Sequence, residues 1–387
     1  MTILLKGITW GHSRGFLPLV ATAQRFHETH PDVRVEWSIR SLQEFADFSI
    51  VDLAQVYDLI VIDHPFTGHA AEGGILAPID EWVSSDFLAD QSENSVGPSH
   101  ASYFYGGHQW ALAVDAATPI AGWRTDLLER HHDSPPRTWE ELLELAKRGL
   151  VVVPAIPIDS LMHFYMFCNV LGAVPLAGGQ RVVDEDVGVK ALEMQRELML
   201  LCDPRCLSMN PIGVWELLAE GDTAAYCPFA YGYSNYSRAG YARNVLRTGG
   251  LIELKTNARF RSTLGGAGLA IASGCKHKEL ASEYARYVAS PDCQATLYFN
   301  SGGQPGHSSA WRSEEVNRRS NGFFENTFAT LTEAYLRPRF HGYLDFQGHA
   351  GSIVHRHLTG GDSARATVGV LNQWLVTCQR KHQGDRG

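Results

Sequence analysis

Apolar residues recur along the first part of the chain with a period that switches between that of a strand and that of a helix. Short apolar or alternating runs predict strands, and the spacing of Leu19, Ala23 and Phe26 places three apolar side chains on one face of a helix. The predicted elements are strands over 4–10, 33–39 and 58–62, and helices over 18–30 and 42–55. This order predicts a mostly parallel sheet with helices on both faces.

In such sheets, ligands bind beyond the carboxyl ends of the strands. Two polar segments directly follow predicted strands, namely His12–Gly15 after the first and Asp63–Pro65 after the third. Both segments are therefore candidates for ligand contact.

Length and charge limit the possible classes of function. A chain of 387 residues suits two domains better than one. A net charge of −9, with scattered Lys and Arg, argues against nucleic acid as a partner. The longest apolar runs, such as Val151–Ile158, are shorter than the roughly 20 residues of a membrane span.

The cysteines and the start of the chain bear on the cellular compartment. Seven cysteines at irregular spacings do not form a disulfide framework, so we expect mostly free, buried thiols. Cys202 and Cys206 are the one close pair. The start, Met1–Lys6, has none of the features of a leader peptide. These observations favour the cytoplasm slightly, with a periplasmic location if a leader was removed.

The segment Thr263–Trp311 combines a glycine-flanked apolar strand, a helix that begins near Lys278 and a Gly302–Pro305 turn. It resembles the family 1 extracellular solute-binding proteins, the maltose-binding-protein-like receptors of ABC importers. Further segments resemble the same family in the same order; these are Tyr105–Pro119, Trp123–Leu128, Pro136–Ala146, Leu217–Tyr226 and Leu331–Tyr343.

The resemblance implies a periplasmic-binding-protein-like α/β fold. Two discontinuous lobes would each have a central, mostly parallel sheet flanked by helices, with a ligand cleft between them. It places residues 1–114 and 264–312 in lobe I and residues 115–263 and 313–387 in lobe II. The hinges would lie near 113–118 and 260–266.

In the first lobe, Arg14 offers a planar guanidinium suited to a carboxylate or phosphate, next to a helix N-terminus. His12 and Ser13 lie in the same loop, which could equally be a polar surface turn. Asp63 and His64 are expected to contact ligand, although adjacent residues on an extended chain point opposite ways and Asp63 could cap a helix instead. The resemblance also suggests Asp115 as a cleft residue, or as a hinge residue bonded to backbone.

In the second lobe, Asp159 and His163 follow the strand near Val151. The resemblance makes them cleft residues; otherwise Asp159 is a helix cap and its neighbours are core. Tyr231 and Tyr233 belong to a tyrosine-rich segment that suits stacking on a sugar or aromatic ring, and a structural aromatic cluster is an equal alternative.

Metal and catalytic motifs are not apparent. The densest histidine groups, His131–His132 and His355–His357, lack metal-ligand spacing and are expected at the surface. We predict no metal, no cofactor and no catalytic residues.

We therefore predict a solute-binding protein that closes on a carbohydrate or an anionic organic acid between two lobes. The expected partners are the small ligand and an ABC permease, and we expect a monomer. The alternative is a cytoplasmic enzyme or ligand sensor on the same fold, in which Asp63, His64, Asp159 and His163 perform acid–base chemistry.

Overall fold

The computed structural model describes residues 2–47 and 49–384, whose contacts group into two compact units. Unit 1 comprises the described residues up to Ala117, together with Leu264–Thr332 and Arg339–His341. Unit 2 comprises Thr118–Thr263, Glu333–Pro338 and the described residues from Gly342 onward. Residues 115–117, 313–332 and 339–341, which the sequence interpretation assigned to lobe II, thus lie in unit 1.

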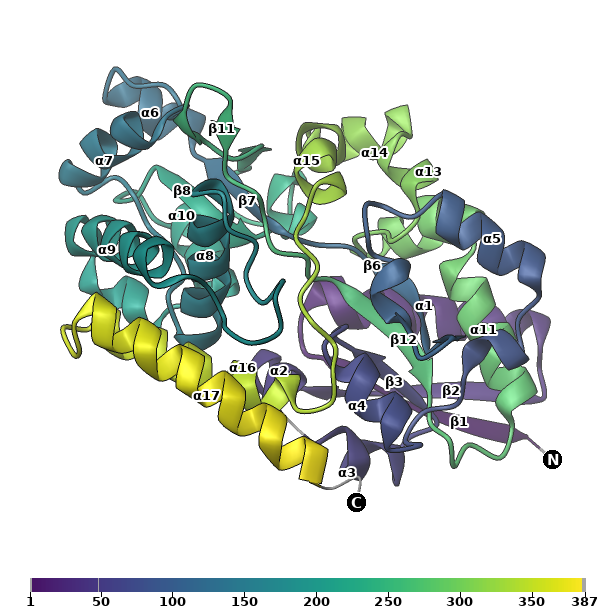
Figure 1. Cartoon of the computed structure of the whole chain (residues 1–387). Coiled ribbons are helices and arrows are strands. Elements are labelled where there is room, and N and C mark those ends of the chain that lie inside the picture. The colour runs from purple at the N-terminus through teal and green to yellow at the C-terminus, as the bar shows by residue number, and fades with distance from the viewer. Residues whose placement is uncertain (1, 48, 385–387) are drawn as a thin grey trace. The chain divides into compact units, whose positions relative to one another are not determined.

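The sheet of unit 1 has the strand order β2-β1-β3-β12-β6 (Figure 1). Strand β1 pairs in parallel with β2 and β3, whereas β12 is antiparallel to both β3 and β6. Strand β12 therefore runs against the other four strands of the sheet, and the carboxyl ends of β1, β2, β3 and β6 share one edge. The strand bounds are Ile3–Trp10 (β1), Val33–Arg40 (β2), Leu59–Ile62 (β3), Ala111–Asp115 (β6) and Ala267–Ile271 (β12).

Helices α1 and α11 bury their apolar faces in the main core of unit 1, together with the side chains of the sheet. Tyr284 of α11 joins the two helices, since its hydroxyl donates to the carbonyl of Leu19 at 3.1 Å. The helices of unit 1 are α1 (Ser13–Thr29), α2 (Leu42–Asp47), α3 (Ile50–Ala54), α4 (Phe66–Glu72), α5 (Ser85–Glu93), α11 (Lys278–Ala289), α12 (Pro291–Cys293), α13 (Ser308–Trp311), α14 (Glu314–Arg319) and α15 (Phe323–Thr332). A small hairpin is formed by β4 (Phe104–Tyr105) and β5 (His108–Gln109).

Two predicted helices differ from those observed. The first begins at Ser13, before Pro18, because His12 accepts the Arg14 N–H and starts the helix one turn earlier. Pro18 then lies inside α1. The helix predicted over 42–55 is two short helices, and Ser49 caps the second of them.

The sheet of unit 2 has the order β8-β7-β9, with antiparallel pairs throughout. A parallel bridge between Val151 and Tyr226 extends it beyond β8. The mostly parallel arrangement expected for each lobe thus describes unit 1 better than unit 2. The strands are β7 (Pro119–Trp123), β8 (Tyr226–Tyr231) and β9 (Arg247–Gly249), with a separate hairpin of β10 (Glu253–Lys255) and β11 (Ala258–Arg259).

Helix α8 is the buried centre of unit 2, because every residue from Asp159 to Cys168 is buried. It packs against α16 and α9, and α17 packs on both of these (Figure 1). Gly351 of α16 permits a close approach, since a Cβ there would lie 2.8 Å from the Pro157 carbonyl oxygen. The helices are α6 (Thr125–Arg130), α7 (Trp139–Lys147), α8 (Pro157–Val170), α9 (Glu185–Leu201), α10 (Pro211–Glu220), α16 (Tyr343–Leu358) and α17 (Ala364–Gly384).

Candidate functional site

The predicted ligand residues of unit 1 meet at one edge of its sheet. His12–Arg14 follow β1, Asp63 and His64 follow β3, and Asp115 is the last residue of β6. These three strands point the same way, so the side chains gather beyond their carboxyl ends. The sequence interpretation placed the first two groups at this edge, but it could not place Asp115 there.

Arg14 and Asp115 form a buried ion pair. The Arg14 Nε–H donates to Asp115 Oδ2 at 2.8 Å, and Nη2 donates to Oδ1, so the contact is bidentate. The two residues are only 4% and 1% exposed. Burial raises the pKa of Asp115, while the charge and the hydrogen bonds of Arg14 oppose this rise. The guanidinium thus has an internal carboxylate partner, which the sequence did not reveal.

His12 has a structural role in addition to its place at the edge of the sheet. Its Nδ1 accepts the N–H of Arg14 at 3.0 Å and caps α1, where Ser13 is the first helical residue. Burial, with a smaller contribution from the Arg14 charge, lowers the pKa of His12 to about 4. His12 is therefore an uncharged hydrogen-bonding group at neutral pH.

The indole ring of Trp10 lies beside the Arg14 side of the ion pair. The guanidinium carbon of Arg14 lies 5.8 Å from the centre of the Trp10 ring, a cation–π distance. Gly15 allows α1 to approach this ring, because a Cβ at Gly15 would overlap it.

Asp63 and His64 contact each other, contrary to the expectation that they point opposite ways. The His64 N–H donates to Asp63 Oδ1 at 2.8 Å, and His64 Nδ1 lies 3.2 Å from the same oxygen. The chain turns directly after β3, as the hydrogen bond from Phe66 N to Asp63 O indicates, and the extended geometry ends there. His64 is fully buried, whereas Asp63 is partly exposed.

In unit 2, Asp159 and His163 lie one turn apart on α8 and both are 3% exposed. Burial raises the pKa of Asp159 to about 8, and Asp159 Oδ2 has no hydrogen-bond partner among the described residues. Burial lowers the pKa of His163 to about 4, and its ring centre lies 5.7 Å from that of Phe229. At neutral pH Asp159 is therefore mostly a neutral acid and His163 a neutral base.

Tyr231 and Tyr233 lie at the carboxyl end of β8. The Trp215 Nε1–H donates to the Tyr231 carbonyl at 2.7 Å and fixes this end of the strand. Tyr233 contacts the edge of Tyr236, whose hydroxyl donates to Glu216 at 2.6 Å. The segment therefore contains a structural aromatic cluster. Tyr231 is partly exposed, and Tyr233 is buried.

Comparison with known sequences decides the family. The sequence profile described as "Bacterial extracellular solute-binding protein" matches residues 10–204, which is half of the chain. The chain belongs to this family. The matched range includes all the candidate residues at the carboxyl ends of the unit 1 strands, from Trp10 to Asp115, and the first half of unit 2, as the resemblance implied.

Solved structures share the fold of this family member over nearly its whole length. The maltose-bound MalE3 of T. maritima superposes with a TM-score of 0.84 at 18% identity, covering 97% of this chain and 100% of that one. A solute-binding protein from Thermotoga lettingae bound with alpha-D-tagatose gives 0.81 at 18% identity, with coverages of 97% and 100%. The GacH receptor of Streptomyces glaucescens gives 0.80 at 16% identity, with 98% of each chain covered. The fold is therefore that of the periplasmic-binding-protein-like solute-binding proteins.

One curated relative is named a maltotriose-binding protein and comes from Pyrococcus abyssi. It is 27% identical over 126 residues, which are 33% of this chain and 26% of the relative. The match thus spans about a quarter of that relative's length.

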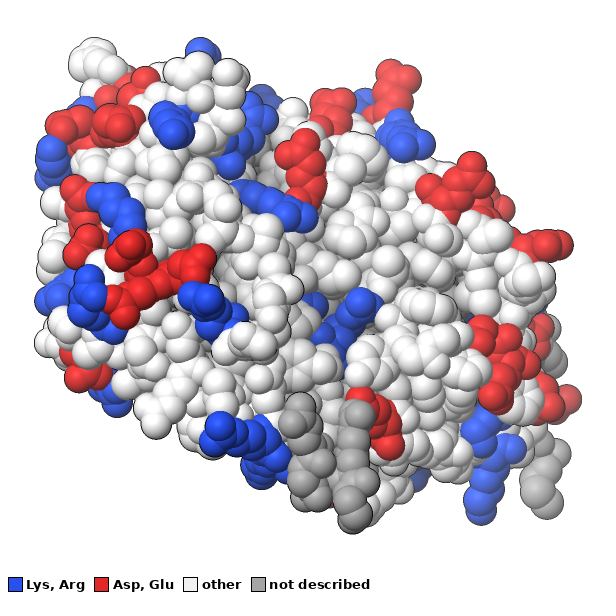
Figure 2. Space-filling model, viewed as in Figure 1, with Lys and Arg blue, Asp and Glu red and all other residues white. Residues whose placement is uncertain are grey.

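Other features of this solute-binding protein bear on metal and membrane contacts. Within residues 2–47 and 49–384, no cluster of three or more His, Cys, Asp or Glu residues could hold a metal ion. No helix in the same ranges combines the length and the apolar character that a membrane crossing needs. Figure 2 shows acidic and basic side chains intermixed on the visible face, with no extended basic area there.

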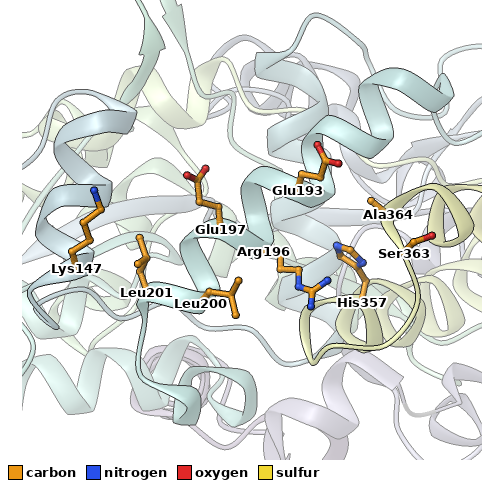
Figure 3. A pocket seen from close by; sticks show the side chains of 9 residues that line it. All are labelled: Lys147, Glu193, Arg196, Glu197, Leu200, Leu201, His357, Ser363 and Ala364. Atoms are coloured by element: carbon orange, nitrogen blue, oxygen red, sulfur yellow. The ribbon is translucent and has the colours of Figure 1, made fainter.

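A hollow of about 550 Å³ lies on unit 2 between side chains of α7, α9 and the α16–α17 turn (Figure 3). His357 lines it, and its Nδ1 donates to the Asp362 carbonyl at 2.8 Å. His357 is 2% exposed, so the expectation of a surface residue is wrong for this position. It falls on the inner face of α16 because Val354 and Leu358, on either side of it, are also buried.

Proposed function

We propose that this chain is a receptor for a neutral carbohydrate or sugar alcohol, and that it delivers this ligand to an ABC permease. The family and the fold support a solute-binding role. Several similar solved structures point to the ligand class, since they are described as bound to maltose, alpha-D-tagatose, D-mannitol and ribitol. The relative from Pyrococcus abyssi is named for maltotriose.

The observation that carries the choice of a neutral ligand is the charge state of the candidate residues. Arg14, the obvious anchor for an anion, already has the Asp115 carboxylate as a bidentate partner. His12 and His163, each with a pKa of about 4, are uncharged at neutral pH. A carboxylate or phosphate ligand needs a positive partner, whereas sugar hydroxyls need only donors and acceptors.

We assign roles to the candidates on this basis. Asp63 accepts ligand hydroxyls, and the protonated Asp159 both donates and accepts. Tyr231 and Tyr233 offer ring faces and hydroxyls, the combination that suits a sugar ring. The remaining candidates either contact the ligand or hold these residues in place; they are His12, Ser13, His64 and His163, with the Arg14–Asp115 pair.

We propose further that units 1 and 2 correspond to the two lobes of the family. The hinges would then lie where the chain passes from one unit to the other, near 117–118 and 263–264 and in the segment 333–342.

Calorimetric titration tests the ligand class. Maltose, maltotriose, tagatose, ribitol and mannitol are titrated into the protein, with citrate and phosphate as anionic competitors. We expect heat of binding from at least one neutral compound and none from the anions. Binding of the anions alone would contradict the proposal. Recovery of the sugar unchanged, checked by NMR, separates a receptor from an enzyme.

Paired variants test the residue roles. Asp63→Asn and Tyr231→Ala, one in each unit, should each weaken binding at least tenfold. Asp52→Asn is the matched control, because Asp52 is an exposed carboxylate on α3 of unit 1. If the control weakens binding as much as Asp63→Asn, the assignment of Asp63 fails.

We propose that the chain acts outside the cytoplasm, as the description of its family suggests. Fractionation of the native cells, with a cytosolic marker and an exported marker, tests this location. Recovery with the exported marker supports the import role. Recovery only with the cytosolic marker contradicts it and favours an intracellular sensor.

A further inference from the structure

The segment before α13 is joined to the end of α5 by backbone hydrogen bonds within unit 1. The Ser308 N–H donates to the Asn94 carbonyl at 2.8 Å, and the Val96 N–H donates to the Gly306 carbonyl at 3.3 Å. These bonds place His307 beside the last turn of α5. His307 is 4% exposed, and its ring lies between a hydroxyl of its own segment and a carboxylate of α5.

The hydrogen bonds at Nδ1 fix the tautomer of His307. The Ser309 backbone N–H donates to Nδ1 at 3.3 Å, so this nitrogen carries the lone pair. The Ser309 hydroxyl lies 2.7 Å from the same nitrogen and is therefore the donor. The ring proton of the neutral imidazole is then on Nε2. Ser309 thus has the hydrogen bond to a base that an activated serine needs.

Asp90 faces the other side of the imidazole ring. Its Oδ2 lies 3.4 Å from His307 Nε2, which is an ion-pair distance rather than a full hydrogen bond. Catalytic contacts are often this long when no substrate is bound. Asn94 Nδ2 donates to Asp90 Oδ1 at 2.8 Å, so Oδ2 is the oxygen left for the ring. Burial lowers the pKa of His307, although the Asp90 carboxylate opposes this, so the imidazole can accept a proton at neutral pH.

We propose that Ser309 is a nucleophile for acyl transfer, with His307 as its general base and Asp90 as the residue that positions the imidazole. The acyl donor is a small activated ester. Ser309 Oγ attacks the carbonyl carbon of the ester and passes its proton to His307 Nδ1, while Asp90 stabilises the imidazolium. The bond from the acyl carbon to the leaving oxygen then breaks, and the departing alkoxide or phenolate takes the proton from His307. The products are O-acylated Ser309 and a free alcohol or phenol, with no change of oxidation state.

The exposures of the residues suit this chemistry. Ser309 is exposed, so an ester in solution can reach its hydroxyl, whereas His307 is shielded. Helix capping alone does not account for the arrangement, because the cap of α13 uses only the Ser309 N–H and requires no carboxylate behind the ring. The adjacent Ser308 has neither feature, since it is 1% exposed and its hydroxyl has no hydrogen-bond partner among the described residues. The cluster therefore selects one of two neighbouring serines.

Acetylation of the full chain by p-nitrophenyl acetate tests this proposal. Release of p-nitrophenolate is followed by absorbance, and acid-quenched samples are digested with trypsin, which yields the peptide 287–312 with both serines for fragmentation by mass spectrometry. We expect an acetyl group on Ser309 in the wild type and in Ser308→Ala. Ser309→Ala should lose this acetylation and release p-nitrophenolate more slowly. The variant keeps the backbone N–H that completes the α13 cap, so it should fold normally.

Asp90→Asn and the pH profile separate a general base from a merely structural histidine. Asp90→Asn keeps the size of the side chain and removes the charge that stabilises the imidazolium, so acetylation of Ser309 should slow by about tenfold or more. Because the pKa of His307 is lowered from 6.5, the rate should be nearly level from about pH 8 to about pH 6.5 and should fall in more acid solution. Asp52→Asn, which changes an exposed carboxylate of α3, is the matched control and should leave the rate unchanged.

Three results would overturn the proposal. These are acetylation confined to lysines and the N-terminus, reaction of Ser309 no faster than that of Ser308, and a Ser309 rate that is insensitive to Asp90→Asn and rises about tenfold per pH unit, as expected for hydroxide-driven attack. None of these measurements requires a sugar, so failure of this proposal leaves the proposed receptor function intact.

Discussion

The guanidinium of Arg14 and the carboxylate of Asp115, which are 101 positions apart in the chain, form a bidentate and almost fully buried ion pair at the edge of the unit 1 sheet. The pair joins the first turn of α1 to the last residue of β6. It removes the strongest cationic candidate from anion binding, and it fixes the start of α1, next to His12, against the end of β6.

Removal of one member of this pair should destabilise unit 1 strongly. Asp115→Leu leaves the Arg14 charge buried without its carboxylate, which we expect to cost about 3–5 kcal/mol in the free energy of unfolding. The double variant Arg14→Met/Asp115→Leu should recover much of this loss, because it buries no unpaired charge. Urea unfolding followed by circular dichroism measures both. A double variant as unstable as the single one would contradict this account.

Asp159 should make the protein less stable as the pH rises. Its folded pKa of about 8 lies above the ordinary value of 3.8, so the folded state binds more protons between these values. The free energy of unfolding should therefore fall as the pH rises from about 4 to about 8, by at most about 6 kcal/mol at about 1.4 kcal/mol per pKa unit. Asp159→Asn should flatten this dependence, whereas the exposed control Asp52→Asn should not. Parallel pH profiles for Asp159→Asn and the wild type would contradict the assignment.

His12 should have the opposite effect, because it should make the protein less stable as the pH falls. Its folded pKa of about 4 lies below the ordinary value of 6.5, so the unfolded chain binds more protons between these values. Stability from His12 is thus present above about pH 6.5 and is lost as the pH falls towards 4. His12→Asn keeps a side chain that caps helices but removes the titrating group. Urea midpoints measured from pH 7 to pH 4 should fall less steeply in this variant; an unchanged slope would be evidence against a buried neutral His12.

Two glycines of α16 offer a matched test of the packing behind Asp159. Gly351→Ala places a Cβ against the Pro157 carbonyl at the start of α8, so we expect a loss of about 1–3 kcal/mol. Gly348→Ala, three residues earlier in the same helix, meets no atom within 4 Å and should stabilise by about 0.5–1 kcal/mol. Thermal unfolding distinguishes them. Equal effects from both substitutions would mean that α16 does not approach α8 closely.

The sequence predicts local structure well where one short signal decides it. Thr138 caps α7, since the Glu141 N–H donates to Thr138 Oγ1 at 3.3 Å, and a Thr three residues before a Glu is a local signal for a helix start. The strand after Thr263 and the helix from Lys278 are present, and all seven cysteines are free and buried as expected.

The predictions from sequence fail in two respects: they miss contacts between segments that are far apart in the chain, and they miss local turns. No pattern in the sequence pairs Arg14 with Asp115, because the contact depends on the register of the folded sheet. Extended geometry does not persist at Asp63 and His64, since the chain turns there. The raised pKa of Asp159 likewise arises from burial on all sides of α8, which composition alone does not predict.

Calorimetric titration of the wild-type protein with the neutral sugars and sugar alcohols, and with the anions, is the most direct test of the central claim. The account predicts saturable 1:1 binding of at least one neutral compound, weakened by both Asp63→Asn and Tyr231→Ala. Saturable binding of an anion, with no heat from any neutral compound, would contradict it.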